Sequence, residues 1–396
     1  MHGVEGFMYP NEVELQWSIL IVLYPFITGL VAGAFILASL ERVFRVEAVK
    51  PTYRLALLTA LSFMLVAPLP LQLHLGHPER SFEMFTTPHR TSAMAMFGFV
   101  YLWYLAVVLL LEIWLDYRRD IVTLATSASG PRRWIYRMLT LGSYNISARA
   151  LAVDERAGYI ITVVGIPSAF LLHGYVGFIF GSVKANPWWS TPLMPIVFLF
   201  SAMVSGIALV MLMYMGAARL RRQHLDMRCL DTIARYLFYT FLIDFSLEML
   251  DLIHRMYEAG ESFQSLDFMV HTRLFLSQVL LQILAGTCVP LVLLAATQVY
   301  RFAESTRRRM YGVAGCLTLV GIFAMRWNVV IGGQLFSKSF LGYTTYKLEF
   351  ATREGLLPSI LLMLLPFVIL WGLITVLPPW PAGPVEKAGG AYGGVA

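Results

Sequence analysis

Three carboxylates interrupt an apolar segment in the second half of the chain. Asp244, Glu248 and Asp251 lie within residues 233–256, a stretch otherwise long and apolar enough to cross a bilayer. Their i, i+4, i+7 spacing places them along one stripe of an α-helix. A carboxylate in hydrocarbon costs at least ~2.5 kcal/mol on the mildest insertion scale, so the stripe must face protein, water or a ligand. Like charges one helical turn apart in a low dielectric also favour proton uptake, and the pattern therefore predicts a proton relay.

Composition indicates what kind of protein holds this stripe. Hydrophobic residues make up 58% of the 396-residue chain, charged residues 14%, and the mean hydropathy is +0.67. A soluble protein carries about a quarter charged residues, so this chain is predicted to be an integral membrane protein. Its three cysteines are far apart and form no CxxC pair, which excludes an iron–sulfur motif within the chain. The net charge of +6 is attributed to the membrane-facing loops and not to a nucleic-acid partner.

Hydropathy predicts an all-α polytopic fold with nine spans, each near the ~20 residues that a bilayer requires. The spans are placed at about 17–40, 55–75, 92–115, 157–180, 193–218, 233–256, 274–299, 310–331 and 356–377. The predicted domain organisation is an external segment 1–16, a single transmembrane domain 17–378 with an inner loop 116–156, and a flexible cytoplasmic tail 379–396.

The distribution of basic residues predicts the orientation in the membrane. Of the 30 Lys and Arg residues, 21 fall on the side that carries loops 41–54, 116–156, 219–235 and 300–309 and the tail after residue 377. Basic residues mark the cytoplasmic side, so the N-terminus is expected outside and the C-terminus inside.

With this orientation, polar residues from several spans share the outer half of the membrane. They are His74, His173, Tyr175, Glu248, Asp251, Arg326 and Asn328, with Gln278 and Gln282 near the same level and Asp244 closer to the middle. The inner half is expected to hold no equivalent cluster. Each residue also has a plainer interpretation: Arg326 as the structural ion-pair partner of Glu248 or Asp251, His173 as a packing histidine, and the glutamines as interhelical hydrogen-bond donors.

The residue types exclude some kinds of cofactor site and favour others. The sequence has no Gly-rich phosphate loop, and a b-type haem needs two histidines meeting across helices, whereas only His173 lies clearly inside a span. No metal site is predicted. A quinone needs an apolar slot, donors to its two carbonyl oxygens and a route for two protons. His173, Tyr175 and the carboxylate stripe are candidates for these polar roles.

Four segments carry a resemblance to a known family. Residues 171–209 (LLHGYVGFIFGSVKANPWWSTPLMPIVFLFSAMVSGIAL) resemble the fourth and fifth spans of the NrfD/PsrC family of polysulfide reductase membrane subunits, and residues 17–40 resemble its opening helix, with GxxxG spacing at Gly29 and Gly33. Residues 73–85 (LHLGHPERSFEMF) are similar to the family segment that follows its second span, although His74 stands where the family often has Asp. Residues 326–334 (RWNVVIGGQ) resemble the Arg/Asn motif of its longer members.

The resemblance implies two four-helix bundles with one or more extra spans, in a quinone-reactive subunit that has no redox metal of its own. Such a subunit resides in the inner (cytoplasmic) membrane and binds menaquinone or ubiquinone. It docks a ferredoxin-like iron–sulfur subunit, which here would lie on the outer face with a catalytic or cytochrome subunit. The implied pocket involves His74, His77, Arg80, His173 and Tyr175. Gln278 and Asn328 are further pocket candidates, and Asp244, Glu248, Asp251 and Arg326 are the candidate proton relay.

Two other functions remain open at this point. A secondary transporter would use the carboxylates and Arg326 as a coupling site, but neither an inverted repeat nor a broken helix is evident. A passive membrane anchor for an external enzyme would leave the charges inside the spans without a role.

Overall fold

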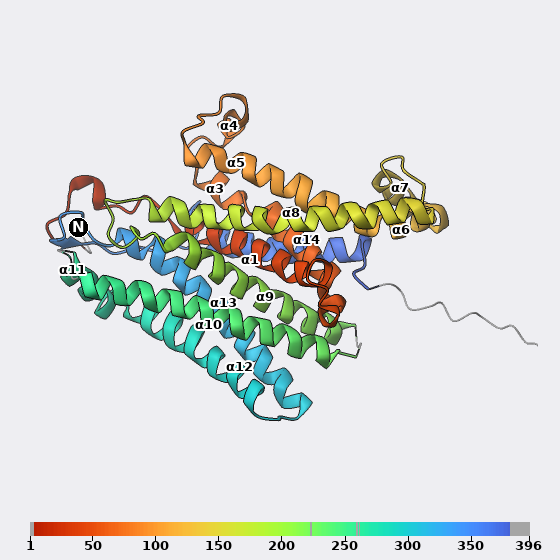
Figure 1. Ribbon diagram of the computed structural model, residues 1–396. Helices are drawn as coiled ribbons and strands as arrows, with labels where there is room; N and C mark the ends of the chain where they lie inside the picture. The colour runs from red at the N-terminus through yellow and green to blue at the C-terminus, as the bar shows by residue number, and fades with distance from the viewer. Residues whose placement is uncertain (1–3, 222–223, 259, 261, 381–396) are drawn as a thin grey trace, which may run out of the picture.

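The computed structural model describes residues 4–380 apart from 222–223, 259 and 261, and its described part consists mainly of long helices that run side by side (Figure 1). The α-helices are α1 (Ile19–Arg42), α2 (Tyr53–Val66), α3 (Leu69–His74), α4 (Glu83–Thr86), α5 (Ala93–Trp103), α6 (Leu111–Ser127), α7 (Gly130–Leu139), α8 (Ala148–Gly181), α9 (Met194–Leu220), α10 (Met227–Glu258), α11 (Phe263–His271), α12 (Val289–Val299), α13 (Glu304–Val330) and α14 (Leu356–Val376). Two π-helical segments, η4 (Tyr104–Leu110) and η5 (Phe275–Cys288), lead into α6 and α12. The 3-10 segments are η1 (Pro10–Glu12), η2 (Glu47–Thr52), η3 (Pro78–Arg80) and η6 (Gly332–Gln334).

The structure agrees with an all-α polytopic membrane protein. The described residues contain eight helices that are long and apolar enough to cross a membrane. These helices coincide with eight of the nine predicted spans. The remaining predicted span, 233–256, lies within α10, which is too rich in charged residues to be counted with them. Helices α6 and α8 extend further into 116–156 than hydropathy predicts, because polar helical turns can continue beyond the apolar core of a span. The number of spans and the orientation remain predictions.

Helix α1 is the centre of the fold. It is apolar on every side, and every residue from Ile19 to Ser39 is buried, as expected for a helix surrounded by other helices. It packs against α9, α2, α8 and α13. For description, the first group of helices comprises α1, α2, α8 and the α5–η4–α6 rod, with α14 against α2. The second comprises α9, α10, α13 and the η5–α12 rod.

The two groups meet where α1 crosses α9 at glycines. A Cβ atom on Gly33 would lie 2.8 Å from the Cα of Gly206 and closer still to the carbonyl oxygen of Ala202. Only a hydrogen fits between these backbones, so Gly33 of the GxxxG segment permits the close approach of α1 and α9.

Replacing Gly33 with leucine is therefore expected to destabilise the protein. Overpacking a well-packed core costs about 1–3 kcal/mol, and here the obstructing atoms belong to the backbone and cannot rotate away. The thermal unfolding midpoint in detergent should fall relative to wild type. Gly372→Leu is the matched control, because a Cβ at Gly372 meets no atom within 4 Å. Equal midpoints for the two variants would contradict this account of the crossing.

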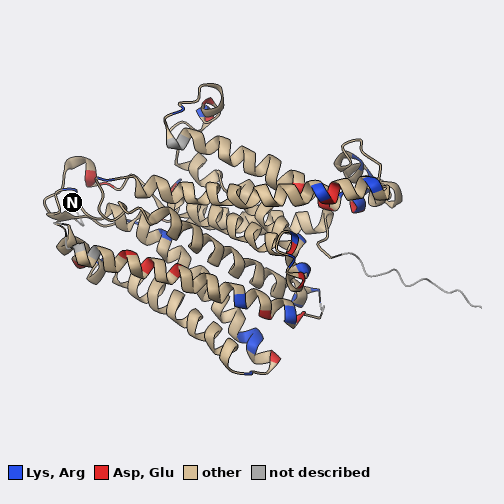
Figure 2. Cartoon of the chain, viewed as in Figure 1, with Lys and Arg blue, Asp and Glu red and all other residues tan. Residues whose placement is uncertain are grey.

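The two ends of the bundle differ in charge. Figure 2 shows Lys and Arg gathered at the end where α6 and α7 lie, and few of them elsewhere. This is the side that the sequence predicts to be cytoplasmic. At the other end, β1 (Glu5–Gly6) pairs antiparallel with β2 (Gly342–Tyr343). The Gln334 side chain hydrogen-bonds the backbone of Trp17 there, so the N-terminal segment is joined to the chain beyond α13.

Candidate functional site

Arg326 is fully buried at the junction of α8, α9 and α13. Its Nη2 donates to His173 Nε2 at 3.0 Å and to Ser201 Oγ at 2.6 Å. Its guanidinium carbon lies 4.0 Å from the centroid of the Phe198 ring. Within the described part of the chain, Arg326 makes these contacts in place of an ion pair with Glu248. Its partners therefore tie three helices together at one buried point.

His173 is held as a neutral imidazole by its neighbours. Arg326 can only donate, so His173 Nε2 must accept and the ring proton is assigned to Nδ1. Nδ1 lies 3.3 Å from Thr28 Oγ1, and the Thr28 hydroxyl donates to Tyr24 O at 3.0 Å. Gly29 leaves room for the ring, since a Cβ there would sit 3.2 Å from His173 Cε1. Both ring nitrogens are occupied, and the side chain is 0% exposed.

The carboxylate stripe lies on a helix, as predicted, and faces the second group of helices. Asp244 is 1% exposed. Gln282 Nε2 donates to Glu248 Oε2 at 3.2 Å, and Gln282 Oε1 accepts from Asn328 Nδ2 at 2.8 Å. Asn328 Oδ1 accepts from Ser277 Oγ at 2.6 Å. This chain of hydrogen bonds links α10, η5 and α13, so Gln282 acts as the interhelical donor that the plainer interpretation predicts.

Asp244 and Arg326 approach each other from α10 and α13. The charges of Asp244 and Glu248 both interact with that of Arg326. Within the described residues, neither Asp244 Oδ1 nor Arg326 Nε has a hydrogen-bond partner, although both atoms are buried. One is an acceptor and the other a donor. An internal water is the usual way to satisfy such a pair.

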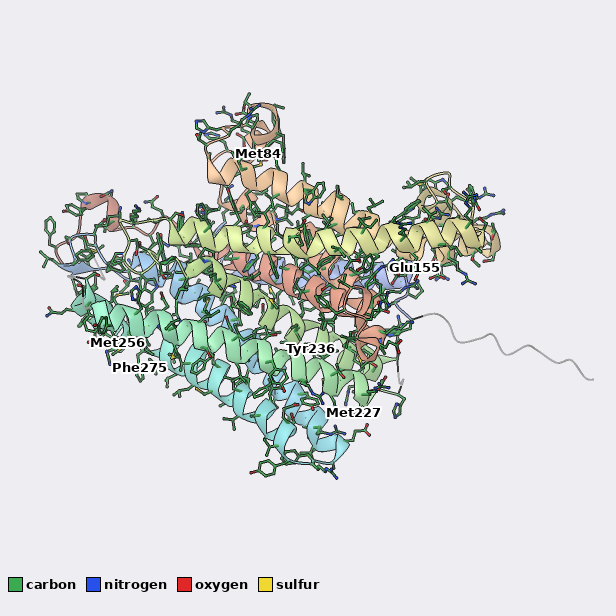
Figure 3. The ribbon with its side chains drawn as sticks, viewed as in Figure 1. Met84, Glu155, Met227, Tyr236, Met256 and Phe275 are labelled. Atoms are coloured by element: carbon green, nitrogen blue, oxygen red, sulfur yellow. The ribbon has the colours of Figure 1, made fainter. Side chains whose placement is uncertain are left out.

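The Asp251 end of the stripe borders a cavity. Thr191 Oγ1 donates to Asp251 Oδ1 at 2.6 Å. Asp251, Thr191, Lys184 and His254 are among the residues that line a cavity of about 220 Å³, which is smaller than the pockets that usually hold drug-sized ligands. Figure 3 marks the two ends of α10 at Met227 and Met256, and Asp251 lies five residues before Met256. A cavity of about 700 Å³ lies near the Met227 end, lined in part by Arg228 and Arg235, and contains none of the predicted site residues.

The Tyr175 side chain projects from a different face of α8 than the His173 side chain does. Its ring stacks on Phe97 of α5, with centroids 5.9 Å apart, and Phe97 in turn packs edge-on against Tyr24 at 5.4 Å. The Tyr175 hydroxyl is buried and makes no hydrogen bond within the described part of the chain. The structure therefore separates two residues that the sequence places in one pocket, because positions two apart on a helix point in nearly opposite directions.

The three residues that follow the second span lie at the bundle surface. His74 Nδ1 is 2.9 Å from Glu354 Oε2, and His77, whose side chain is 75% exposed, contacts Glu79. Arg80 donates two hydrogen bonds to Glu83, which lower the pKa of the Glu83 carboxyl. None of the three contacts His173 or Arg326 in the described structure. Gln278 Oε1 is buried and has no hydrogen-bond partner among the described residues.

Several residues that organise the site are not evident from the sequence. Thr28 and Ser201 are small hydroxyls inside apolar helices and carry no pattern of their own. The Trp188 and Trp189 indoles donate to the carbonyl oxygens of Asn328 and Val329, at 2.9 and 2.6 Å, and so fix the end of α13. In the sequence, the pair of tryptophans next to a span is the feature from which these last two contacts could have been predicted.

The expectation of no polar cluster in the other half is wrong. Glu112 of α6 is 0% exposed. It accepts hydrogen bonds from Thr162 at 2.7 Å and from Tyr53 at 3.1 Å, and Arg42 joins Tyr53 to Asp116. Hydropathy places Glu112 near a span boundary, where single charges are common, and only the fold shows that this one is enclosed.

Comparison with known proteins gives consistent matches. A family model described as polysulphide reductase, NrfD, matches residues 9–338. The chain is 27% identical over 369 residues to one of the subunits of the selenate reductase of Mesobacillus selenatarsenatis, which covers 88% of this chain and 84% of that protein. It is 26% identical over 204 residues to protein NrfD of Escherichia coli, which covers 50% of this chain and 59% of that protein.

Proposed function

The chain belongs to the polysulphide reductase NrfD family, and we propose that it is the quinone-reactive membrane subunit of a multi-subunit oxidoreductase. The name of the selenate reductase relative supports the coarser part of this proposal, a subunit of a reductase complex, and the eight long apolar helices support a place in the membrane. The observation that carries the finer part is the set of buried polar side chains in which Arg326 bonds to His173 and its charge interacts with those of Asp244 and Glu248 on α10. In an apolar bundle such a set is costly unless it is used.

The Tyr175 hydroxyl is the side-chain donor best suited to a quinone carbonyl. It is buried without a hydrogen bond among the described residues, and it sits beside the flat apolar surface of Phe97. His173 already uses both ring nitrogens, so its role is to position α1 and α13. A quinone, menaquinone or ubiquinone, supplies two-electron chemistry coupled to two protons. This chain contributes a donor, an apolar wall and a proton route.

The carboxylates provide that proton route. Asp251 lines the cavity at one end of α10, Glu248 lies one turn further in, and Asp244 is enclosed beside Arg326. A proton entering at Asp251 would pass to Glu248 and then to Asp244, with Arg326 balancing the charge of the last two. Electrons are exchanged with a ferredoxin-like iron–sulfur subunit, which docks with a catalytic or cytochrome subunit at the end that carries β1 and β2.

Changing Tyr175 to phenylalanine tests the proposal. It removes one hydrogen bond worth ~1 kcal/mol, so kcat/KM for quinol should fall roughly fivefold while the complex still assembles. His173→Gln should instead lower the stability of the chain, because Arg326 and Thr28 lose a fitted partner. The measurement is quinol turnover by the purified complex together with its thermal unfolding. Wild-type turnover in Tyr175→Phe would remove Tyr175 from the quinone site.

A further inference from the structure

Glu112 is a buried carboxylate without an ion pair. It lies in α6, within the candidate span Ala95–Ser127. Arg42, which lies within electrostatic range of Glu112, directs its hydrogen bonds to Tyr53, Asp116 and the carbonyl oxygen of Glu155. No ion pair with Glu112 occurs among the described residues. Enclosing an unpaired carboxylate is so costly that such a group normally takes up a proton.

One carboxylate oxygen of Glu112 accepts hydrogen bonds, and the other has no partner among the described residues. Thr162 of α8 and Tyr53 of α2 both donate to Oε1, whereas Oε2 has no partner within the described part of the chain. The hydroxyl of Tyr104, from η4, is also buried without a partner there, and it lies within electrostatic range of Glu112. A proton on Oε2, or a water beside it, supplies what these two atoms need.

A ladder of carboxylates leads from Glu112 to the surface. Asp116 and Asp120 follow it at i+4 and i+8, so all three share one stripe of α6. The Asp116 and Asp120 side chains are 15% and 43% exposed, which gives a steady rise from the enclosed Glu112. Arg54 bridges the two aspartates, with 2.7 Å to each.

This stripe points to the opposite end from the α10 stripe. Arg42 Nη2 donates to the carbonyl oxygen of Glu155 at 3.3 Å, and Figure 3 shows Glu155 far from Met256, at the end where Figure 2 shows basic residues gathered. The α6 stripe belongs to the helix group of α1, α2 and α8, whereas the α10 stripe belongs to the group of α9 and α13.

We propose that Glu112 is a second proton-binding site, which exchanges protons with the arginine-rich end of the bundle along the polar stripe of α6. A proton from water reaches Glu112 Oε2 along the polar stripe of α6 and returns to water by the same way. Arginine does not release its proton, so Arg42 and Arg54 position the aspartates and balance their charge. The groups that face Glu112 are Arg42 from α1, Tyr53 from α2, Tyr104 from η4, Thr162 from α8 and Asp116 on α6 itself. This site needs no quinone.

Infrared difference spectroscopy tests the site directly. The full chain, with any subunits that co-purify, is placed in lipid nanodiscs and its spectrum is recorded at successive pH values. Wild type should show a carbonyl band of a protonated carboxylic acid that Glu112→Gln lacks. Asp154→Asn is the matched control and should keep the band, because Asp154 is also buried at this end but is paired with Arg118 at 3.1 Å. A spectrum of Glu112→Gln identical to that of wild type would overturn the assignment.

Two further variants keep the test decisive. Glu112→Asp retains a carboxyl group and should shift the band to a different frequency, so an unshifted band would show that it arises elsewhere, even if the glutamine variant folds poorly. Asp116→Asn should slow the appearance of the band severalfold after a rapid change of pH. An unchanged rate would exclude the proposed route along α6.

Discussion

Replacing Arg326 with leucine is expected to destabilise the protein by about 3 kcal/mol, the cost of leaving a buried charge without its partner. The substitution removes the donor to His173 Nε2 and Ser201 Oγ and the positive charge opposite Asp244. Three helices, α8, α9 and α13, lose their common contact. The thermal unfolding midpoint of the purified chain should fall well below that of wild type, and quinol turnover should be lost with it.

A double variant separates charge from packing. Arg326→Leu combined with Asp244→Leu removes both members of the interaction, so it should be less destabilising than the sum of the two single changes. Asp120→Leu is the matched control for Asp244→Leu, because it removes a half-exposed carboxylate on a different helix and should not couple to Arg326. Strict additivity in the Arg326–Asp244 pair would show that the two charges do not interact.

Hydropathy was sufficient to predict most of the fold. Each of the nine predicted intervals contains a long helix, because burial of the backbone polar groups in a bilayer permits little else. What hydropathy does not give is the neighbour of each helix. That information depends on contacts such as Gly33 against Gly206, in which a pair of glycines distant in sequence permits one particular crossing.

The candidate site was predicted less completely, and the reason is geometric. Helical periodicity places Asp244, Glu248 and Asp251 on one stripe, and the structure has that stripe. Depth in the membrane is a weaker guide, because it groups residues without regard to the face of the helix on which they lie. His173 and Tyr175 share a depth but not a face, and Glu112 was overlooked because its enclosure depends on Thr162 and Tyr53 from two other helices.

The carboxylate stripes of α6 and α10 have a similar arrangement of acids but different neighbouring side chains. In each stripe one carboxylate is enclosed within the bundle, Glu112 in α6 and Asp244 in α10. Another carboxylate of the same stripe lies nearer an end of the bundle and is more accessible. The enclosed acids differ in their neighbours: Asp244 lies beside the positive charge of Arg326, whereas Glu112 is held by two hydroxyls. A nearby cation stabilises a charged carboxylate, and neutral donors around an enclosed acid do so less. Asp244 and Glu112 are therefore expected to differ in how readily they hold a proton.

Glu248→Gln is expected to slow quinol turnover by about 100-fold, the lower range of what a positioned acid or base contributes. Glutamine keeps the size of the side chain and can still bond to Gln282, which itself bridges to Asn328. The hydrogen-bonded link from α10 to η5 and α13 should therefore survive, and the loss should appear in kcat at an unchanged thermal midpoint.

The matched control for Glu248→Gln is Gln278→Leu, which alters a polar residue predicted at a similar depth whose side chain cannot carry a proton. Gln278 Oε1 makes no hydrogen bond within the described residues, so this change should leave turnover close to that of wild type. If Glu248→Gln also turned over at the wild-type rate, the α10 stripe would serve only to hold the helices together. If it slowed turnover while Gln278→Leu did not, then proton transfer through Glu248 would be the property that distinguishes the two variants.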